Sequence, residues 1–349
     1  MKTVVRTLAA LAVLGALGGA AVVGIGLYNV SAQPGHFPGV SWVLHTTYRN
    51  SVRLRAPDAG DVPDLTDPAM IELGARHYDT ACRTCHAAPD QARSATMVAM
   101  VPAPPHISDA VKDWEPRHMH WIVHNGIKMS GMPHWPAERS DDVWPVVAFL
   151  SAVKSGMSGV EYAELTAIPQ QDGLRGYCAG CHDIRPSDHV PRLDIQNAAY
   201  LKMSMLAYRD GARQSGIMAQ AVSKLPESAL DEMANWFASQ TPSGSGAGSL
   251  DPDLVMRGRD LAYAASGDPD VPACRACHGP EASEASPFFP SLSGQPAAYL
   301  RTQLDLWRQG TRGGGARSNL MQQAADGLSD ADIAALAAFF ASLPPSKRD

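Results

Sequence analysis

The motif Cys-x-x-Cys-His occurs three times in this 349-residue chain, at Cys82–His86, Cys178–His182 and Cys274–His278. Two thiols at this spacing followed directly by an imidazole are the attachment signature of a c-type haem, whose iron the histidine ligates. The first cysteines of successive motifs are 96 residues apart in both intervals, and the motifs use all six cysteines. The sequence therefore predicts three small consecutive domains that together bind three haem c groups.

The predicted haem-binding residues follow directly from the motifs. Covalent attachment is assigned to Cys82, Cys85, Cys178, Cys181, Cys274 and Cys277, and proximal ligation of iron to His86, His182 and His278. Half of a zinc site or a thioredoxin-like redox pair would share the cysteine spacing. A zinc ribbon needs a second cysteine pair within about 15–20 residues, and none lies that close; a redox pair needs no histidine.

An apolar segment opens the chain. Lys2 and Arg6 precede an uncharged run from Thr7 to Val30. A spanning helix needs about 20 apolar residues, whereas a secretory core needs about 7–15. We therefore expect residues 1–30 to be a transmembrane anchor with a cytoplasmic N-terminus. The alternative is a signal peptide that is cleaved after Ala32.

Length and charge set the remaining limits. A chain of 349 residues suits two or three domains, and its net charge of −6 indicates no nucleic-acid partner. Residues 31–67 contain four prolines and no clear period, so we expect an extended stalk or wrapping segment.

The first predicted domain covers residues 68–160. Asp67 suits a helix N-cap and Pro68 a first helical position. Gly74 would allow a second helix to cross the first closely. Ser140 is a candidate N-cap for the closing helix, but Pro145 lies deep for a first turn, so we expect that helix to begin later or to be distorted.

The second and third predicted domains, residues 161–242 and 252–345, repeat each other. Residues 191–201 match residues 290–300 at an offset of 99, and residues 225–239 match residues 328–342 at an offset of 103. The intervening residues 243–251 are a flexible linker by composition. No strand pattern competes with helix, so the predicted fold class is all-α, in three tandem domains.

The sixth iron ligand decides whether a haem passes electrons or binds a small molecule. Met132, between Gly131 and Pro133, is the predicted ligand of the first haem, with Met129 as its competitor. Met218 and Met321 occupy equivalent positions of the repeat and are the predicted ligands of the other two. A methionine ligand raises the reduction potential.

Three further sets of residues each have two possible roles. The carbonyls of Pro105, Pro191 and Pro290 are candidate acceptors for the proximal histidines, or simple loop punctuation. Arg213 and Arg312 are equivalent positions that would pair with haem propionates or with surface acids. His118, His120 and His124 form a cluster whose spacing favours surface or haem-edge packing over a metal site.

These motifs together resemble class I cytochrome c domains: a helix, Cys-x-x-Cys-His, a proline loop, a methionine loop and a final helix. Residues 165–345 resemble the dihaem cytochrome c4 family. Residues 68–155 resemble the single-haem domains of membrane-bound cytochrome subunits, which carry Gly131-Met132-Pro133 in this chain. Asp183 departs from the pattern, because the third motif has Gly279 at that place.

The resemblance implies electron transfer without chemistry on a substrate, in haem domains on the periplasmic side of the inner membrane. The implied partners are a dehydrogenase or quinol-oxidising complex as donor and a terminal oxidase or another acceptor. The chain would be anchored by a single span, or soluble in the periplasm if residues 1–32 are removed. The alternatives are a cytochrome subunit of a membrane-bound dehydrogenase complex and a haem enzyme with an open iron.

Overall fold

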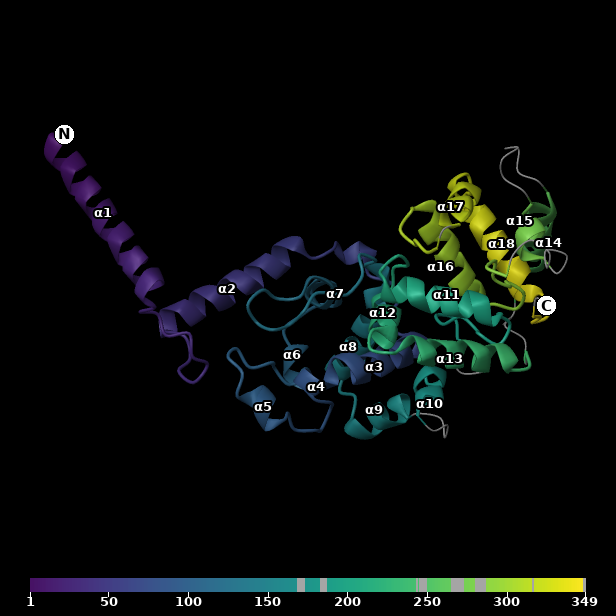
Figure 1. Ribbon diagram of the computed structural model, residues 1–349, viewed down its shortest axis with the longest axis horizontal. Coiled ribbons are helices and arrows are strands. Elements are labelled where there is room, and N and C mark those ends of the chain that lie inside the picture. Colours follow the sequence, from purple (N-terminus) through teal and green to yellow (C-terminus); the bar gives the residue numbers. More distant parts are fainter. Residues whose placement is uncertain are drawn as a thin grey trace.

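The computed structural model describes residues 1–167, 173–182, 187–242, 244, 250–264, 273–279, 287–315 and 317–347. Within these ranges every regular element is helical, and the remaining chain forms turns, loops and three isolated bridges. Figure 1 shows one long helix that projects from a body of packed shorter helices. The expected all-helical secondary structure is confirmed for the described part of the chain.

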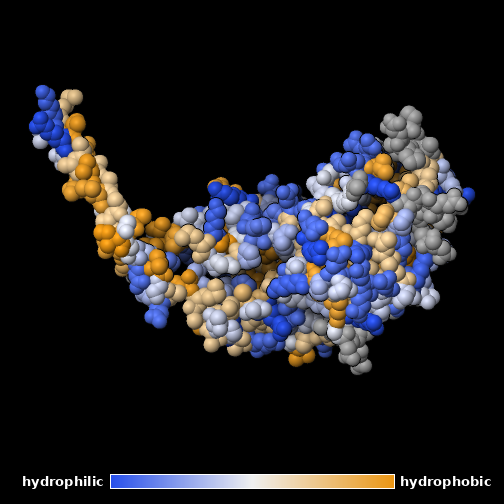
Figure 2. Space-filling model, in the orientation of Figure 1, coloured by the Kyte–Doolittle hydropathy of each residue, from blue (hydrophilic) through white to orange (hydrophobic). Residues whose placement is uncertain are grey.

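Helix α1 (Lys2–Ile25) is the projecting element, and it buries none of its residues. It is the one helix in the described ranges that is long and apolar enough to cross a membrane. Figure 2 shows apolar side chains along most of its length and a hydrophilic tip at the N-terminus. Length and composition thus permit either of the roles expected for this segment.

The segment after α1, for which we expected an extended stalk or a wrapping segment, is partly helical. Helix α2 (Pro38–Arg55) occupies its centre, with Pro38 in the first turn, where a missing N–H costs nothing. Val52 is fully buried in the first hydrophobic cluster, and Tyr48 packs edge-on against Trp114 at 5.5 Å. The second half of this segment is therefore part of the body.

The helices from α2 to α9 form a first group, and α3 (Pro68–Ala81) and α8 (Trp144–Lys154) cross at its centre. Asp67 caps α3 as predicted, since its carboxylate accepts from the Ala69 N–H at 2.9 Å. The closing helix begins after a 3-10 turn, η2 (Asp141–Val143), which places Pro145 in its first turn. The later start that we expected is confirmed. The other elements of this group are η1 (Ala59–Asp61), α4 (Arg83–His86), α5 (Ala95–Val98), α6 (Ile107–Ala110), α7 (Pro116–Asn125) and α9 (Gly159–Thr166).

The second group of helices begins with the short helix α10, and the third contains a helix crossing like that of the first. In that crossing α14 packs on α18. The elements of both groups are α10 (Leu174–Ala179), α11 (Ala198–Arg209), α12 (Gly216–Val222), α13 (Glu227–Ser239), α14 (Pro252–Tyr263), α15 (Cys274–His278), α16 (Ala297–Arg308), α17 (Ser318–Asp326) and α18 (Asp330–Ser342). Asp183, Ser243 and residues 245–249 of the expected linker lie outside the described residues.

Candidate haem sites

Each motif histidine is held by the same contact. The Nδ1 atoms of His86, His182 and His278 lie 2.9, 3.1 and 2.9 Å from the carbonyl oxygens of the candidate prolines. A carbonyl oxygen only accepts, so Nδ1 carries the proton and Nε2 keeps its lone pair for a metal. The predicted role of these carbonyls, on Pro105, Pro191 and Pro290, is confirmed as a hydrogen bond.

The motif cysteines are partly buried thiols, and none of the six forms a disulfide in the described chain. Burial, followed by the neighbouring Cys85, raises the pKa of Cys82 to about 12. Burial and Cys181 likewise raise the pKa of Cys178 to about 11. Reactive thiol pairs need lowered pKa values, so these cysteines do not fit the redox-pair alternative.

The predicted methionine of the third unit faces its histidine. The Sδ atom of Met321 lies 3.4 Å from Nε2 of His278. Met218 lines the same cavity as His182. In the first unit Met132 packs against the hydrophobic cluster, whereas the Met129 side chain is 97% exposed. This contrast favours Met132 over Met129.

One cavity of about 1120 Å³ joins the second and third motifs. It reaches both sets of thiols, both histidines and both methionines, and α3 of the first group contributes Leu73 and His77 to its wall. The cavity is therefore shared between repeats and is closed partly by a third segment.

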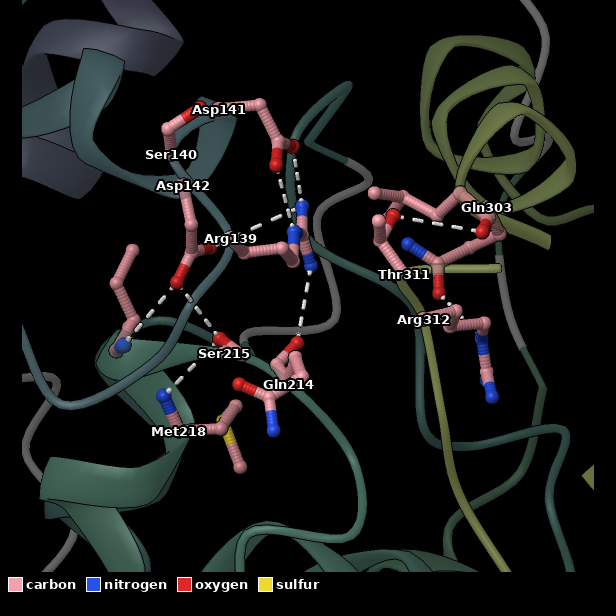
Figure 3. Close-up of polar contacts among 12 residues, drawn as sticks. Arg139, Ser140, Asp141, Asp142, Gln214, Ser215, Met218, Gln303, Thr311 and Arg312 are labelled. Carbon is pink, nitrogen blue, oxygen red and sulfur yellow. Dashed lines mark hydrogen bonds and ion pairs between the residues drawn. The ribbon is translucent and has the colours of Figure 1, made fainter. Parts of the chain in front are cut away.

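Two buried arginines face this cavity, Arg213 and Arg312, with 6% and 9% of their surface exposed. Each guanidinium lies over an aromatic ring, at 4.5 Å from Tyr208 and 4.4 Å from Trp307. Neither forms an ion pair with a carboxylate of the described chain, and Arg312 bonds Gln303 at 2.8 Å (Figure 3). The surface salt-bridge alternative is wrong, because these side chains are not at the surface.

The positive charge of the two arginines changes their surroundings. Burial acts to raise the pKa of Tyr200, but the charges of Arg213 and then Arg312 outweigh it and lower this pKa to about 8. Burial and the Arg213 charge also lower the pKa of Arg312. Buried cations without a protein anion are costly, so this site is built for an anionic group. Haem c, with two propionate carboxylates, fits this charge, the thiol pairs and the paired nitrogen and sulfur donors.

The histidine cluster of the first unit is a packing feature. The rings of His120 and Trp144 stack at 4.1 Å, and His120 Nε2 lies 2.8 Å from the Ser140 carbonyl. His118 and His120 are buried, which excludes the surface half of the expectation of surface or haem-edge packing. Among the described residues no cluster of histidine, cysteine and acidic side chains has the geometry of a metal site.

Sequence reasoning missed the contact between the first unit and the start of α12, the helix that carries Met218 where a methionine loop was expected. Asp142 Oδ2 accepts from the Ser215 hydroxyl at 3.0 Å and from the Ile217 N–H at 3.3 Å. The Ser215 oxygen in turn accepts from the Met218 N–H at 3.3 Å (Figure 3). Asp142 carries no signal of this role in the sequence, where it resembles an ordinary acid at a helix start.

Comparison with known proteins gives two family matches. Residues 69–150 match "Cytochrome C oxidase, cbb3-type, subunit III", and residues 255–344 match "Cytochrome c". Cytochrome c4 of Pseudomonas aeruginosa is 33% identical over 191 residues, which are 54% of this chain and 94% of that protein. A thiosulfate dehydrogenase electron acceptor of Thiomonas intermedia is 31% identical over 173 residues, 48% of this chain and 79% of that protein.

Among solved structures, reduced recombinant cytochrome c4 from Pseudomonas stutzeri is similar, with 30% identity and a TM-score of 0.43. The match covers 49% of this chain and 94% of that one.

Proposed function

This chain belongs to the c-type cytochromes, its C-terminal half to the cytochrome c4 family, and from this we propose that it is a membrane-anchored triheme electron carrier. The single observation that carries the proposal is the repeated proximal contact: three motif histidines each donate Nδ1–H to a proline carbonyl. Haem c supplies reversible one-electron transfer when bound. Every domain would thus contribute one redox centre.

The protein's part is to hold each haem and to close its iron. The cysteine pairs would attach the ring, the fixed tautomer would present Nε2 to the iron, and Met132, Met218 and Met321 would supply a soft thioether sulfur that favours the reduced state. The buried guanidiniums of Arg213 and Arg312 balance the negative propionates of the second and third haems. We assign the three haem domains to residues 68–160, 161–242 and 252–345, with 243–251 as a linker.

Helix α1 supports a place at the inner membrane. A single span would leave the haem domains in the periplasm, where they relay electrons from a dehydrogenase or quinol-oxidising complex to a terminal oxidase or another acceptor. If residues 1–32 are a cleaved signal peptide, the same carrier is soluble in the periplasm.

A second candidate is a cytochrome subunit held permanently in a membrane-bound dehydrogenase complex. The observation that favours it is the similarity to proteins named thiosulfate dehydrogenase electron acceptor. Co-purification of a dehydrogenase with the full-length chain in stoichiometric amount would support this candidate over the mobile carrier. A haem enzyme would need an open iron, and a candidate methionine ligand for each haem argues against it.

Carbon monoxide binding to the dithionite-reduced protein tests the proposal, with haem per polypeptide measured on the same sample. We expect three covalent haems and no carbon monoxide bound, because each iron has two protein ligands. Fewer than three haems would overturn the triheme assignment. Stoichiometric binding at one haem would make the enzyme the better explanation.

A further inference from the structure

The proline that accepts from each proximal histidine in the repeats is followed by a residue whose backbone N–H points the other way. Pro191 C=O and Arg192 N–H are two ends of one peptide unit. The carbonyl accepts from His182 at 3.1 Å, and the N–H donates to the Gln295 Oε1 atom at 3.0 Å. Gln295 Nε2 also donates to the Arg192 carbonyl at 2.9 Å, which fixes its amide orientation.

The same arrangement recurs with the repeats exchanged. Pro290 C=O accepts from His278 at 2.9 Å, and the N–H of Ser291, in the same peptide unit, donates to Gln196 Oε1 at 3.0 Å. Gln196 Nε2 donates to the Ser291 carbonyl at 2.8 Å. The two glutamines are 99 residues apart, the offset of the repeat, and both are buried. Each repeat therefore clamps the proline loop of the other.

We propose that Gln295 and Gln196 are positioning residues that act across the repeat interface, Gln295 setting the reduction potential of the second haem and Gln196 that of the third. The proposal rests on the proposed function, since it requires haem at both motifs. It assigns to each repeat a residue that tunes its neighbour's iron.

The mechanism is polarisation along a short chain of hydrogen bonds. An N–H that donates to a glutamine oxygen makes the carbonyl of the same peptide unit a stronger acceptor, because linked hydrogen bonds polarise one another. A stronger acceptor draws the Nδ1 proton and raises the basicity of the ligating Nε2. A more basic imidazole favours ferric iron, so each glutamine lowers the potential of the haem in the opposite repeat.

The first unit offers an internal comparison. Its His86 donates to Pro105 at 2.9 Å, but the N–H of His106, in the same peptide unit, has no protein acceptor among the described residues. The first haem is thus not linked to either of the two glutamine hydrogen-bond chains, and its reduction potential should not respond to either glutamine.

Gln295→Met and Gln196→Met in the full-length holoprotein test this inference, because methionine keeps the shape and removes the amide. Spectroelectrochemical titration would give three midpoint potentials, assigned with Met132→His, Met218→His and Met321→His, each of which lowers the potential of its own haem. We expect Gln295→Met to raise only the second potential and Gln196→Met only the third. In the ferrous protein, the Nδ1 proton resonance of His182 should move upfield in Gln295→Met, and that of His278 in Gln196→Met.

Two further variants distinguish the effect of the hydrogen-bond chain from a general loosening of the interface between the repeats. Asn197→Ser removes the bond from Asn197 Nδ2 to the Pro287 carbonyl, 2.7 Å across the same interface, and keeps a helix cap; it should leave all three potentials unchanged. Gln295→Glu keeps an acceptor oxygen and should not raise the second potential. Equal shifts of both potentials in either methionine variant, or none, would overturn the inference while three bound haems leave the proposed function intact. A parent protein without the second or third haem would overturn the function itself.

Discussion

Gly74 lies so close to the carbonyl oxygen of Pro145 that a Cβ atom on the glycine would stand 1.9 Å from it. Gly258 has the same relation to Ala335, also at 1.9 Å, in the crossing of α14 with α18. In both places the obstacle is backbone, which cannot turn aside as a flexible side chain does. Cys82 packs against the same hydrophobic cluster as α8 at the first crossing, and Cys274 against the same cluster as α18 at the second.

Gly74→Ala should destabilise the first unit by about 1–3 kcal/mol or more, because overpacking forces the two helix backbones apart. The gain of up to about 1 kcal/mol in helix propensity offsets only part of this. Urea unfolding followed by far-ultraviolet circular dichroism measures the change. Gly60→Ala is the control, since nothing lies within 4 Å of a Cβ there. Equal effects of the two substitutions would contradict the steric argument.

Arg312→Met should lower the stability of the holoprotein by about 3–5 kcal/mol, because it leaves a buried propionate without its cation. It should also lower the potential of the adjacent haem, since loss of a nearby positive charge favours ferric iron. Thermal unfolding and redox titration measure the two effects. Arg301→Met is the control, because Arg301 is an exposed residue of α16, the helix that precedes Arg312, and its removal should change little. A stable Arg312 variant with unchanged potentials would exclude pairing with a propionate.

Features that depend only on residues close together in the sequence were predictable. The motifs, the proline carbonyls, the cap at Asp67 and the glycine of the first crossing each depend on a few neighbouring residues. Helix α2 was missed because four prolines in its region suggested an interrupted segment, although Pro38 sits in the first turn, where proline is tolerated.

Contacts between the units have no such local signal in the sequence. Gln196 and Gln295 are an ordinary matched pair in the repeat until the fold places each against the other's proline loop. The burial of Arg213 and Arg312 depends equally on how the repeats face each other. Such relations arise from tertiary packing, and no sequence period encodes them.

His77 should make the protein lose stability in mild acid. Burial lowers its pKa from 6.5 to about 4. Between these values the unfolded chain binds a proton that the folded chain does not, so stability falls as pH falls from about 6.5 to 4 and levels off below. The loss is about 3 kcal/mol at 1.36 kcal/mol per pH unit. Urea unfolding at several pH values should show this slope in the parent and a flatter one in His77→Phe, which keeps the ring packed on Trp135. His36→Gln, at an exposed histidine, should keep the parent slope; an unchanged slope in His77→Phe would exclude this origin.

Ser215→Ala should loosen the methionine ligand of the second haem. The substitution removes the cap of α12, typically worth about 0.5–2 kcal/mol, and the hydroxyl that links Asp142 to the Met218 N–H. The Met218→His variant shows what share of the far-red charge-transfer band of methionine-ligated ferric haem belongs to the second haem. We expect Ser215→Ala to weaken that share of the band. We also expect imidazole to bind the second haem more tightly. Ser158→Ala is the matched control, because Ser158 caps α9 through the Glu161 N–H at 3.2 Å and is not among the residues lining the shared cavity. A far-red band that keeps its parent intensity in Ser215→Ala, or that weakens equally in both variants, would show that the contact with Asp142 does not support the ligand.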